Sequence, residues 1–119
     1  MDMHQISFAK IYRLRSDLAE IIVDEGVDIN IAMVDEIHTV LLSLLDDSFS
    51  LLINKSHAYS TQLDALIKFG ALAAINKIAI FAPNRMAQMS ADFSATIPSS
   101  AGLNIEVFTT RDDALAWIK

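Results

Sequence analysis

Short runs of almost uninterrupted apolar residues constrain the fold of this chain most strongly. Two of them are Phe49–Ile53 (FSLLI) and Lys77–Ala82 (KIAIFA). Strands with this pattern are typical of parallel sheets, because helices cover both faces of such a sheet. Each run is followed by polar residues that can begin a helix. The sequence therefore predicts an α/β domain built on a mostly parallel sheet.

Two segments near the N-terminus predict an antiparallel hairpin. Ile6–Arg15 partly alternates between apolar and polar residues, and Leu18–Asp24 (LAEIIVD) has the composition of a second strand. Arg15-Ser16-Asp17 stands between them as a turn. Leu103–Thr109 is expected to form the last strand. We therefore expect about five strands, the later ones joined by right-handed crossovers through helices.

About four helices are expected to cover the sheet, from apolar residues that recur at steps of three and four. The first spans roughly Ile31–Leu45, and the third is expected to end at Pro98. The stripe of that third helix consists of Met86, Met89, Phe93 and Ile97. The expected N-caps are Asn30, Ser60 or Thr61, Asn84 and Thr110, with Asp64 and Asp113 completing capping boxes.

The apolar content and the charge exclude several classes of function. Of the 119 residues, 53% are hydrophobic, so a homodimer or an apolar partner face is expected. The net charge of −6 and the scattered Lys and Arg residues disfavour nucleic acid and anionic membrane surfaces as partners. No apolar run approaches the ~20 residues that cross a bilayer, and Met1–Gln5 does not begin a signal peptide. We expect one cytoplasmic domain over residues 1–119, without membrane insertion.

Residues for catalysis or metal binding form no recognisable pattern. The chain has no Cys, and His4, His38 and His57 lie in three different predicted elements, so no metal site is expected. There is no Gly-x-Ser-x-Gly elbow and no glycine-rich phosphate loop. We therefore expect a protein that needs no cofactor, has no catalytic residues and binds rather than catalyses.

The order of the predicted elements resembles the STAS domain, with its SpoIIAA-like (anti-sigma-factor antagonist) and SEC14-like relatives. Two stretches carry the resemblance: the strand, serine-containing loop and helix of Phe49–Ala74, and the ending VFTTRDDALAWIK at Val107–Lys119. The ending is similar to the closing strand and helix of SpoIIAA-like domains. The resemblance implies a regulatory domain that binds a protein partner, such as an anti-sigma factor or a kinase.

The resemblance also indicates a modification site in the loop. Regulatory STAS proteins carry Asp-Ser-Gly where the loop meets the helix, and that serine is phosphorylated. By position Ser56 is the nearest match here and Ser60 the second, but the Asp and the Gly are absent. A phosphoserine at a helix N-terminus would be favoured by free N–H groups and the helix dipole. The alternative is that these serines simply cap the helix.

Five further residues are candidates for contact with a partner. Lys55, His57 and Tyr59 lie in the loop, whereas Met86 and Met89 lie on the third helix. Methionines at helical spacing usually pack a helix against its sheet, but they also adapt to partner surfaces. We expect the loop and its adjoining helix to bind a protein. The alternative is a small-molecule or lipid-binding module of SEC14-like character, which the high apolar content would suit.

Overall fold

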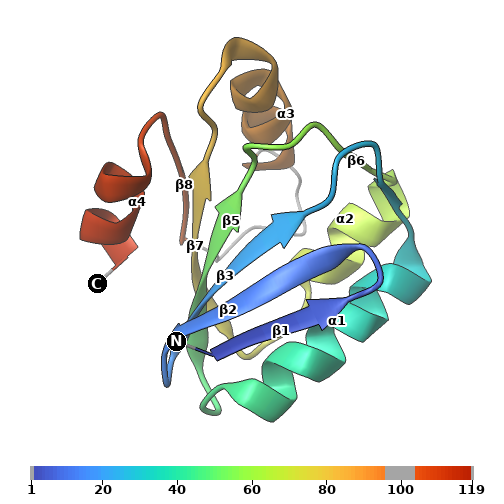
Figure 1. Ribbon diagram of the computed structural model, residues 1–119, viewed down its shortest axis with the longest axis vertical. Coiled ribbons are helices and arrows are strands. Elements are labelled where there is room, and N and C mark those ends of the chain that lie inside the picture. The colour runs from blue at the N-terminus through green and yellow to red at the C-terminus, as the bar shows by residue number, and fades with distance from the viewer. Residues whose placement is uncertain (1, 96–103, 119) are drawn as a thin grey trace.

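The structure is a computed structural model that describes residues 2–95 and 104–118, and its strands form one large and one small sheet (Figure 1). The described strands are β1 (Asp2–Ile6), β2 (Ala9–Arg15), β3 (Leu18–Val23), β4 (Asp28–Ile29), β5 (Phe49–Asn54), β6 (Ser60–Thr61), β7 (Ile75–Phe81) and β8 (Asn104–Phe108). The described helices are α1 (Ile31–Leu44), α2 (Leu63–Gly70), α3 (Arg85–Ala95) and α4 (Arg111–Ile118).

The large sheet confirms the predicted fold class. Its strand order is β1-β2-β3-β5-β7-β8. The pairs β1–β2 and β2–β3 are antiparallel, whereas β3–β5, β5–β7 and β7–β8 are parallel. About five strands were expected, and the described part of the sheet has six. The predicted first strand corresponds to β2, whereas β1, which a turn at Ser7–Phe8 separates from it, lies almost entirely before the predicted start at Ile6. The small sheet pairs β4 with β6, which the sequence pattern did not indicate.

Both faces of the sheet are covered at its central strands β5 and β7, which explains their continuous apolar runs. Leu51 and Ile53 of β5 belong to the larger core cluster, which also contains residues of α1 and α2. Leu52 points to the other face and packs with Ala114 and Ile118 of α4. Figure 1 shows α1 and α2 on one side of the sheet and α4 on the other. The two-sided burial of β5 and β7 is the parallel-sheet arrangement that their sequences predicted.

Three of the four predicted helix caps are confirmed by backbone contacts. The side-chain oxygen of Asn30 accepts a hydrogen bond from the Met33 N–H at 3.0 Å. Asn84 accepts one from the Ala87 N–H at 2.9 Å, and Thr110 Oγ1 one from the Asp113 N–H at 3.2 Å. In each case the side chain satisfies an N–H group that the first helical turn leaves without a partner.

The predicted cap of α2 is wrong. Ser60 and Thr61 form β6, and the N-cap residue is Gln62, whose side chain makes no capping hydrogen bond. Because α2 begins at Leu63, Ser60 and Thr61 lie before the N-cap position, where they pair with β4 instead. The Asp64 carboxylate accepts from the Ala65 N–H at 2.8 Å instead of completing a capping box with Thr61.

The predicted packing role of the α3 methionines is also wrong. Met86 and Met89 are 81% and 65% exposed, whereas Ala87 and Ala91 pack against the core. The helix therefore approaches the sheet through small residues and turns its flexible side chains outward. The side chain of Phe93, together with Ile97, Pro98 and the predicted strand start at Leu103, lies outside the described residues.

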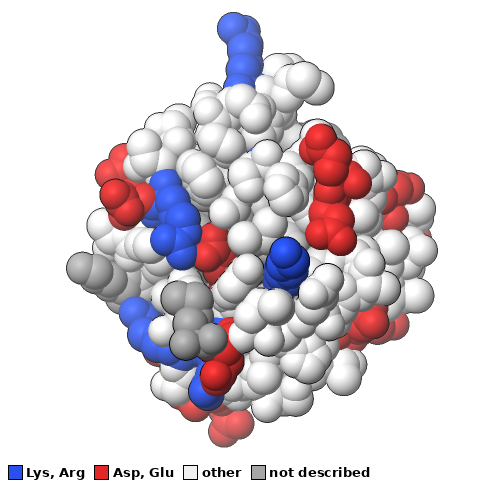
Figure 2. All heavy atoms as spheres, viewed as in Figure 1, with Lys and Arg blue, Asp and Glu red and all other residues white. Residues whose placement is uncertain are grey.

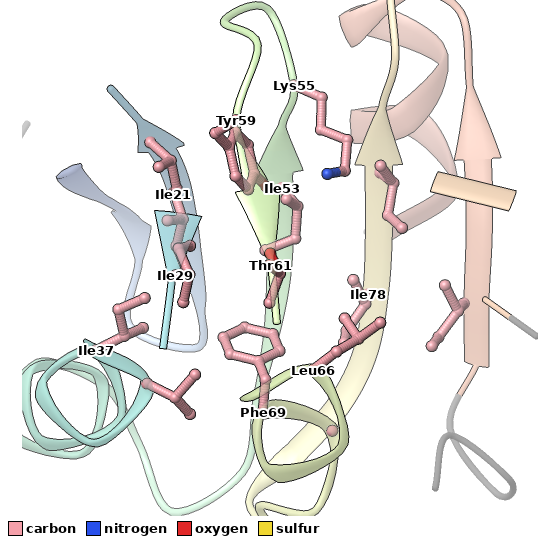
Figure 3. A pocket seen from close by; sticks show the side chains of 15 residues that line it. Ile21, Ile29, Ile37, Ile53, Lys55, Tyr59, Thr61, Leu66, Phe69 and Ile78 are labelled. Carbon is pink, nitrogen blue, oxygen red and sulfur yellow. The ribbon is translucent and has the colours of Figure 1, made fainter. Parts of the chain in front are cut away.

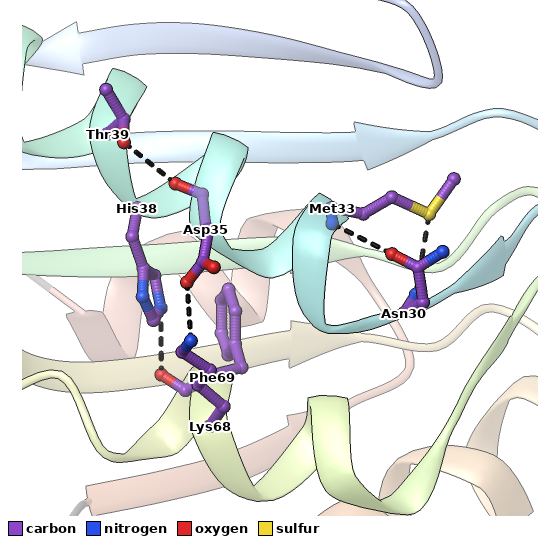
Figure 4. A network of polar contacts seen from close by, with 7 residues as sticks. All are labelled: Asn30, Met33, Asp35, His38, Thr39, Lys68 and Phe69. Atoms are coloured by element: carbon purple, nitrogen blue, oxygen red, sulfur yellow. Dashed lines mark hydrogen bonds and ion pairs between the residues drawn. The ribbon is translucent and has the colours of Figure 1, made fainter.

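A buried histidine joins α1 to α2, as Figure 4 shows. His38 Nε2 lies 3.2 Å from the Phe69 carbonyl oxygen, and the two rings are 5.5 Å apart between centroids. Because a carbonyl only accepts, Nε2 must carry the proton. The nearby ion pair joins Lys68 Nζ to Asp35 Oδ1 at 2.8 Å. Burial lowers the pKa of His38, although the Phe69 carbonyl and Asp35 act in the opposite direction.

This lowered pKa predicts an acid-sensitive contact between the two helices. The unfolded chain binds a proton at His38 more readily than the folded chain, so stability should fall as the pH drops through ~6.5 and below. His38→Gln keeps an N–H donor for Phe69 but does not titrate, so its free energy of unfolding should fall less between pH ~7 and ~5. Urea unfolding at both pH values measures the difference. An equal fall in the free energy of unfolding of both proteins would show that His38 is not the source of the acid sensitivity.

Candidate functional site

Several hydrogen bonds hold the loop between β5 and β6, residues 55–59, against the segment that follows β3. The Ala58 N–H donates to Glu25 Oε1 at 2.8 Å. The Ala58 carbonyl accepts from the Gly26 N–H at 2.7 Å. Gly26 has a φ of 78°, a left-handed conformation that side chains disfavour. His57 Nδ1 lies 3.2 Å from the Val23 carbonyl oxygen. The loop is thus fixed at the end of the sheet where β3 and β5 terminate.

Asp28 accepts two hydrogen bonds from the chain just beyond this loop. Its two carboxylate oxygens accept from Ser60 Oγ at 2.8 Å and Gln62 Nε2 at 3.1 Å. The hydrogen bonds from Gln62 and Ser60 lower the pKa of Asp28. The Ser60 hydroxyl is therefore engaged with a carboxylate. By contrast, the exposed Ser56 makes no side-chain hydrogen bond with the described residues, although its N–H donates to Asn54 Oδ1 at 2.9 Å.

An apolar cavity of about 80 Å³ lies beneath this loop, between the sheet and helices α1 and α2 (Figure 3). Its lining is mainly aliphatic, with Phe69 as an aromatic member. Lys55, Tyr59 and Thr61 are its polar residues. The aliphatic lining includes Ile21, Ile29, Ile37, Ile53, Leu66 and Ile78. Among the residues that the structure describes, no Asp, Glu or His lines the cavity.

Lys55 is the unusual member of this lining. It is only 9% exposed, and Figure 3 shows its ammonium group pointing inward from the end of β5. Nζ lies 4.2 Å from the centre of the Tyr59 ring, and it makes no ion pair or hydrogen bond with the described residues. Burial lowers the pKa of Lys55 to about 8 and raises that of the Tyr59 hydroxyl.

A cleft of about 430 Å³ lies on the outer side of the same loop. The loop contributes Lys55, His57 and Tyr59, and the start of α3 contributes Arg85 and Met86. Lys55 and Tyr59 thus line both the cleft and the cavity. The structure therefore brings together four of the five predicted contact residues. The fifth, Met89, is exposed on α3 but does not line the cleft.

A buried polar network next to the loop was missed by sequence reasoning. The Glu20 side chain is 5% exposed and pairs with Arg111 through Nη2–Oε1 and Nε–Oε2 contacts of 2.7 and 3.1 Å. Asn54 Nδ2 also donates to Glu20 Oε2 at 2.9 Å. Since Asn54 accepts from the Ser56 N–H, the network connects the start of α4 to the loop. The sequence feature that could have indicated this network is Glu20, the single charged residue within the apolar run LAEIIV.

Comparison with known proteins identifies the family. A model of the SpoIIAA-like family matches residues 17–119. The chain belongs to the SpoIIAA-like family. The match begins just before β3, so the β1–β2 segment precedes it. No curated protein and no solved structure matches the chain.

The family assignment confirms the predicted resemblance and indicates a general role. SpoIIAA-like proteins are STAS domains, which are commonly regulatory, generally non-catalytic and generally engaged in protein interactions. Among residues 2–95 and 104–118, no helix is long and apolar enough to cross a membrane. In the same residues, no three His, Asp or Glu side chains gather as metal ligands.

The buried pair predicts a large effect of removing Arg111. Arg111→Met leaves the Glu20 carboxylate buried with only the Asn54 amide, so it should lower the free energy of unfolding by about 2–3 kcal/mol. Adding Glu20→Gln should recover part of that loss, because the unpaired charge is removed. Urea unfolding of the single and double variants measures both effects. A double variant no more stable than Arg111→Met would contradict this account.

The buried ammonium predicts a stabilising substitution. The folded pKa of Lys55, about 8, lies below its ordinary 10.5, so wild-type stability should rise between pH ~8 and ~9.5 as the folded chain loses this proton first. Lys55→Met lacks the charge and should be more stable at pH ~7 by about 1–3 kcal/mol. Its stability should not show the same rise. The test is urea unfolding at pH ~7 and ~9.5.

Lys77 provides the matched control, since its ammonium lies near the Trp117 ring on the α4 side. Lys77→Met removes one positive charge but leaves the Lys55 ammonium in the cavity. It should not raise the stability at pH ~7. A stabilisation equal to that of Lys55→Met would show that general charge, not burial, is responsible.

Proposed function

We propose that this chain is a non-catalytic regulatory domain that binds a protein partner, and that the partner contacts the cleft between the loop of residues 55–59 and α3. The observation that carries the proposal is the outward position of Met86 and Met89 beside a hollow surface. Exposed large apolar side chains next to a cleft are typical of interaction sites. Methionine suits such a site because its side chain is flexible and polarizable.

The charge around the cleft supports a partner of particular chemistry. Arg85 and His57 line it, and no Asp or Glu of the described part of the chain does, although the whole chain carries a net charge of −6. Figure 2 shows that the basic side chains of the drawn face do not merge into one continuous patch. This arrangement favours a partner that presents an apolar residue flanked by acidic ones, rather than a nucleic acid.

The same geometry favours Ser56 over Ser60 as a phosphoacceptor. Ser56 is exposed, whereas a phosphate on Ser60 would face the Asp28 carboxylate that its hydroxyl now contacts. Neither Ser56 nor Ser60 lies at the helix N-terminus where it was predicted, because α2 begins at Leu63. We therefore propose that phosphorylation, where a partner kinase performs it, acts by adding charge at the rim of the cleft. A homodimer, a cytoplasmic location and one domain over residues 1–119 stay predictions.

Site-directed crosslinking tests the interaction surface. A photoreactive amino acid at Met86 should capture a specific protein, whereas one at Leu42, which is also exposed but lies on α1, should not. With the captured protein purified, Met86→Glu and Tyr59→Ala should each weaken binding by about tenfold or more, and Leu42→Glu should have little effect. Calorimetry measures the affinities. Unchanged binding in both cleft variants would reject the surface.

The serine assignment has its own test. Ser56→Asp should change the affinity for that purified partner, whereas Ser60→Asn should leave it almost unchanged because the introduced amide can still donate to Asp28. Incubation with an anti-sigma kinase followed by mass spectrometry should place phosphate on Ser56. Phosphate on Ser60 alone would overturn the preference.

A second candidate function is a small-molecule-binding module, and the cavity under the loop favours it. Ligand sites are commonly concave and mostly apolar, with a few well-placed polar groups. The cavity has this composition. Its volume of about 80 Å³ is too small for a lipid tail, so a small ligand suits it better than a membrane lipid.

A further inference from the structure

The Lys55 ammonium lacks a counter-ion within the described residues. It is nine-tenths buried and points into the apolar cavity in Figure 3. The ion pairs of the described residues are elsewhere: Arg13 with Asp2, Arg15 with Asp17, Lys68 with Asp35 and Arg111 with Glu20. Within residues 2–95 and 104–118, no Asp or Glu lines either the cavity or the adjoining cleft.

The Tyr59 ring only partly replaces that counter-ion. A ring face attracts a cation, and Nζ lies 4.2 Å from the ring centre. A ring supplies no oxygen to accept the three N–H bonds of an ammonium group. Charged groups are rarely buried unless they are paired and hydrogen-bonded. The described residues therefore offer the Lys55 ammonium no negatively charged partner, and a bound anion would supply one.

We propose that the cavity binds a small apolar monocarboxylate, with its carboxylate against Lys55 Nζ and its short chain among the isoleucines. This inference rests on the second candidate function and names the ligand class for it. Burial of one positive charge calls for one negative charge, which a carboxylate supplies. A phosphate group would bring an excess of negative charge into an apolar site.

The size of the cavity limits the chain of the ligand. An apolar cavity of about 150 Å³ holds benzene in another protein, and the volume here is about 80 Å³. A chain of a few carbons suits this space, and a long acyl chain does not. Lys55 and Tyr59 line both the cavity and the cleft, so the ligand would enter from the cleft between these two side chains.

Two hydroxyl groups complete the proposed site. Thr61 and Tyr59 line the cavity, and neither hydroxyl makes a hydrogen bond with the described residues. Each can donate to a carboxylate oxygen that the ammonium leaves free. The other titratable residues that line the cleft are His57 and Arg85, neither of which lines the cavity.

The test is an NMR titration of the full chain with three probes of similar size: butyrate, butanol and butylammonium. Butyrate should shift the methyl signals of Ile21, Ile53 and Ile78 saturably, and butanol should bind about tenfold or more weakly. Butylammonium should not bind, because it places a second cation beside Lys55. Butyrate should also raise the pKa of Lys55 above its value of about 8, followed through labelled lysine.

Two lysine variants separate the charge from the cavity. Lys55→Met should lose the preference for butyrate over butanol, whereas Lys77→Met should keep it. Equal affinities for butyrate and butanol in the wild-type chain, or an unchanged preference in Lys55→Met, would overturn the inference. If butanol binds the cavity and butyrate does not, the carboxylate is rejected while the ligand-binding module stands. If no probe binds, both are rejected.

Discussion

The burial of β5 on both faces is the constraint on which the rest of the structure depends. Every residue of Phe49–Asn54 is buried, and the adjacent Leu51 and Leu52 are both fully covered although they point to opposite faces. One face requires α1 and α2, and the other requires α4. The middle residues of a strand enclosed in this way are not exposed to solvent. The loop at its C-terminal end is therefore where polar chemistry can gather, as is usual in open α/β sheets.

Two buried charged residues near that end of the sheet, Glu20 and Lys55, differ in how well their charges are paired. Glu20 is fully provided with donors, since Arg111 and Asn54 both contact its carboxylate. Among the described residues, Lys55 Nζ has the face of the Tyr59 ring but no ion-pair partner. Lowering its pKa from 10.5 to about 8 corresponds to about 3 kcal/mol of unfavourable burial at neutral pH. A methionine would fill the same space without that cost, and such costly groups are concentrated at functional sites.

The fold was largely predictable because it follows from patterns that are local in sequence. The apolar runs at β5 and β7 correctly predicted the parallel sheet. Asn30, Asn84 and Thr110 correctly predicted where three helices begin. The cap of α2 was not predictable in this way, because Ser60 and Thr61 pair with β4 about 30 residues earlier. Met86 and Met89 had helical spacing, but spacing alone cannot distinguish an outward stripe from one packed on the sheet.

The candidate site was only partly predictable for the same reason. The loop residues Lys55, His57 and Tyr59 were candidates by position, but nothing local shows that Lys55 turns inward and His57 does not. The cavity exists because α1 and α2 lie over the sheet at a distance their side chains do not completely fill. Glu20 and Arg111 are 91 residues apart, so their pairing depends on the tertiary fold.

The shared lining of the cavity and the cleft links the two proposed activities physically. Tyr59 and Lys55 form one wall of each space. An anion beside Lys55 would compete with the Tyr59 ring for the ammonium, and any shift of that ring alters the surface that a protein partner meets. Coupling between two sites is reciprocal, so a partner that fixes Tyr59 would change the affinity of the cavity by the same factor. The hydrogen bonds that tie Ala58 and Ser60 to the segment after β3 keep the loop backbone in place. Such a coupling would therefore act through these two side chains and would not require the domain to change its fold.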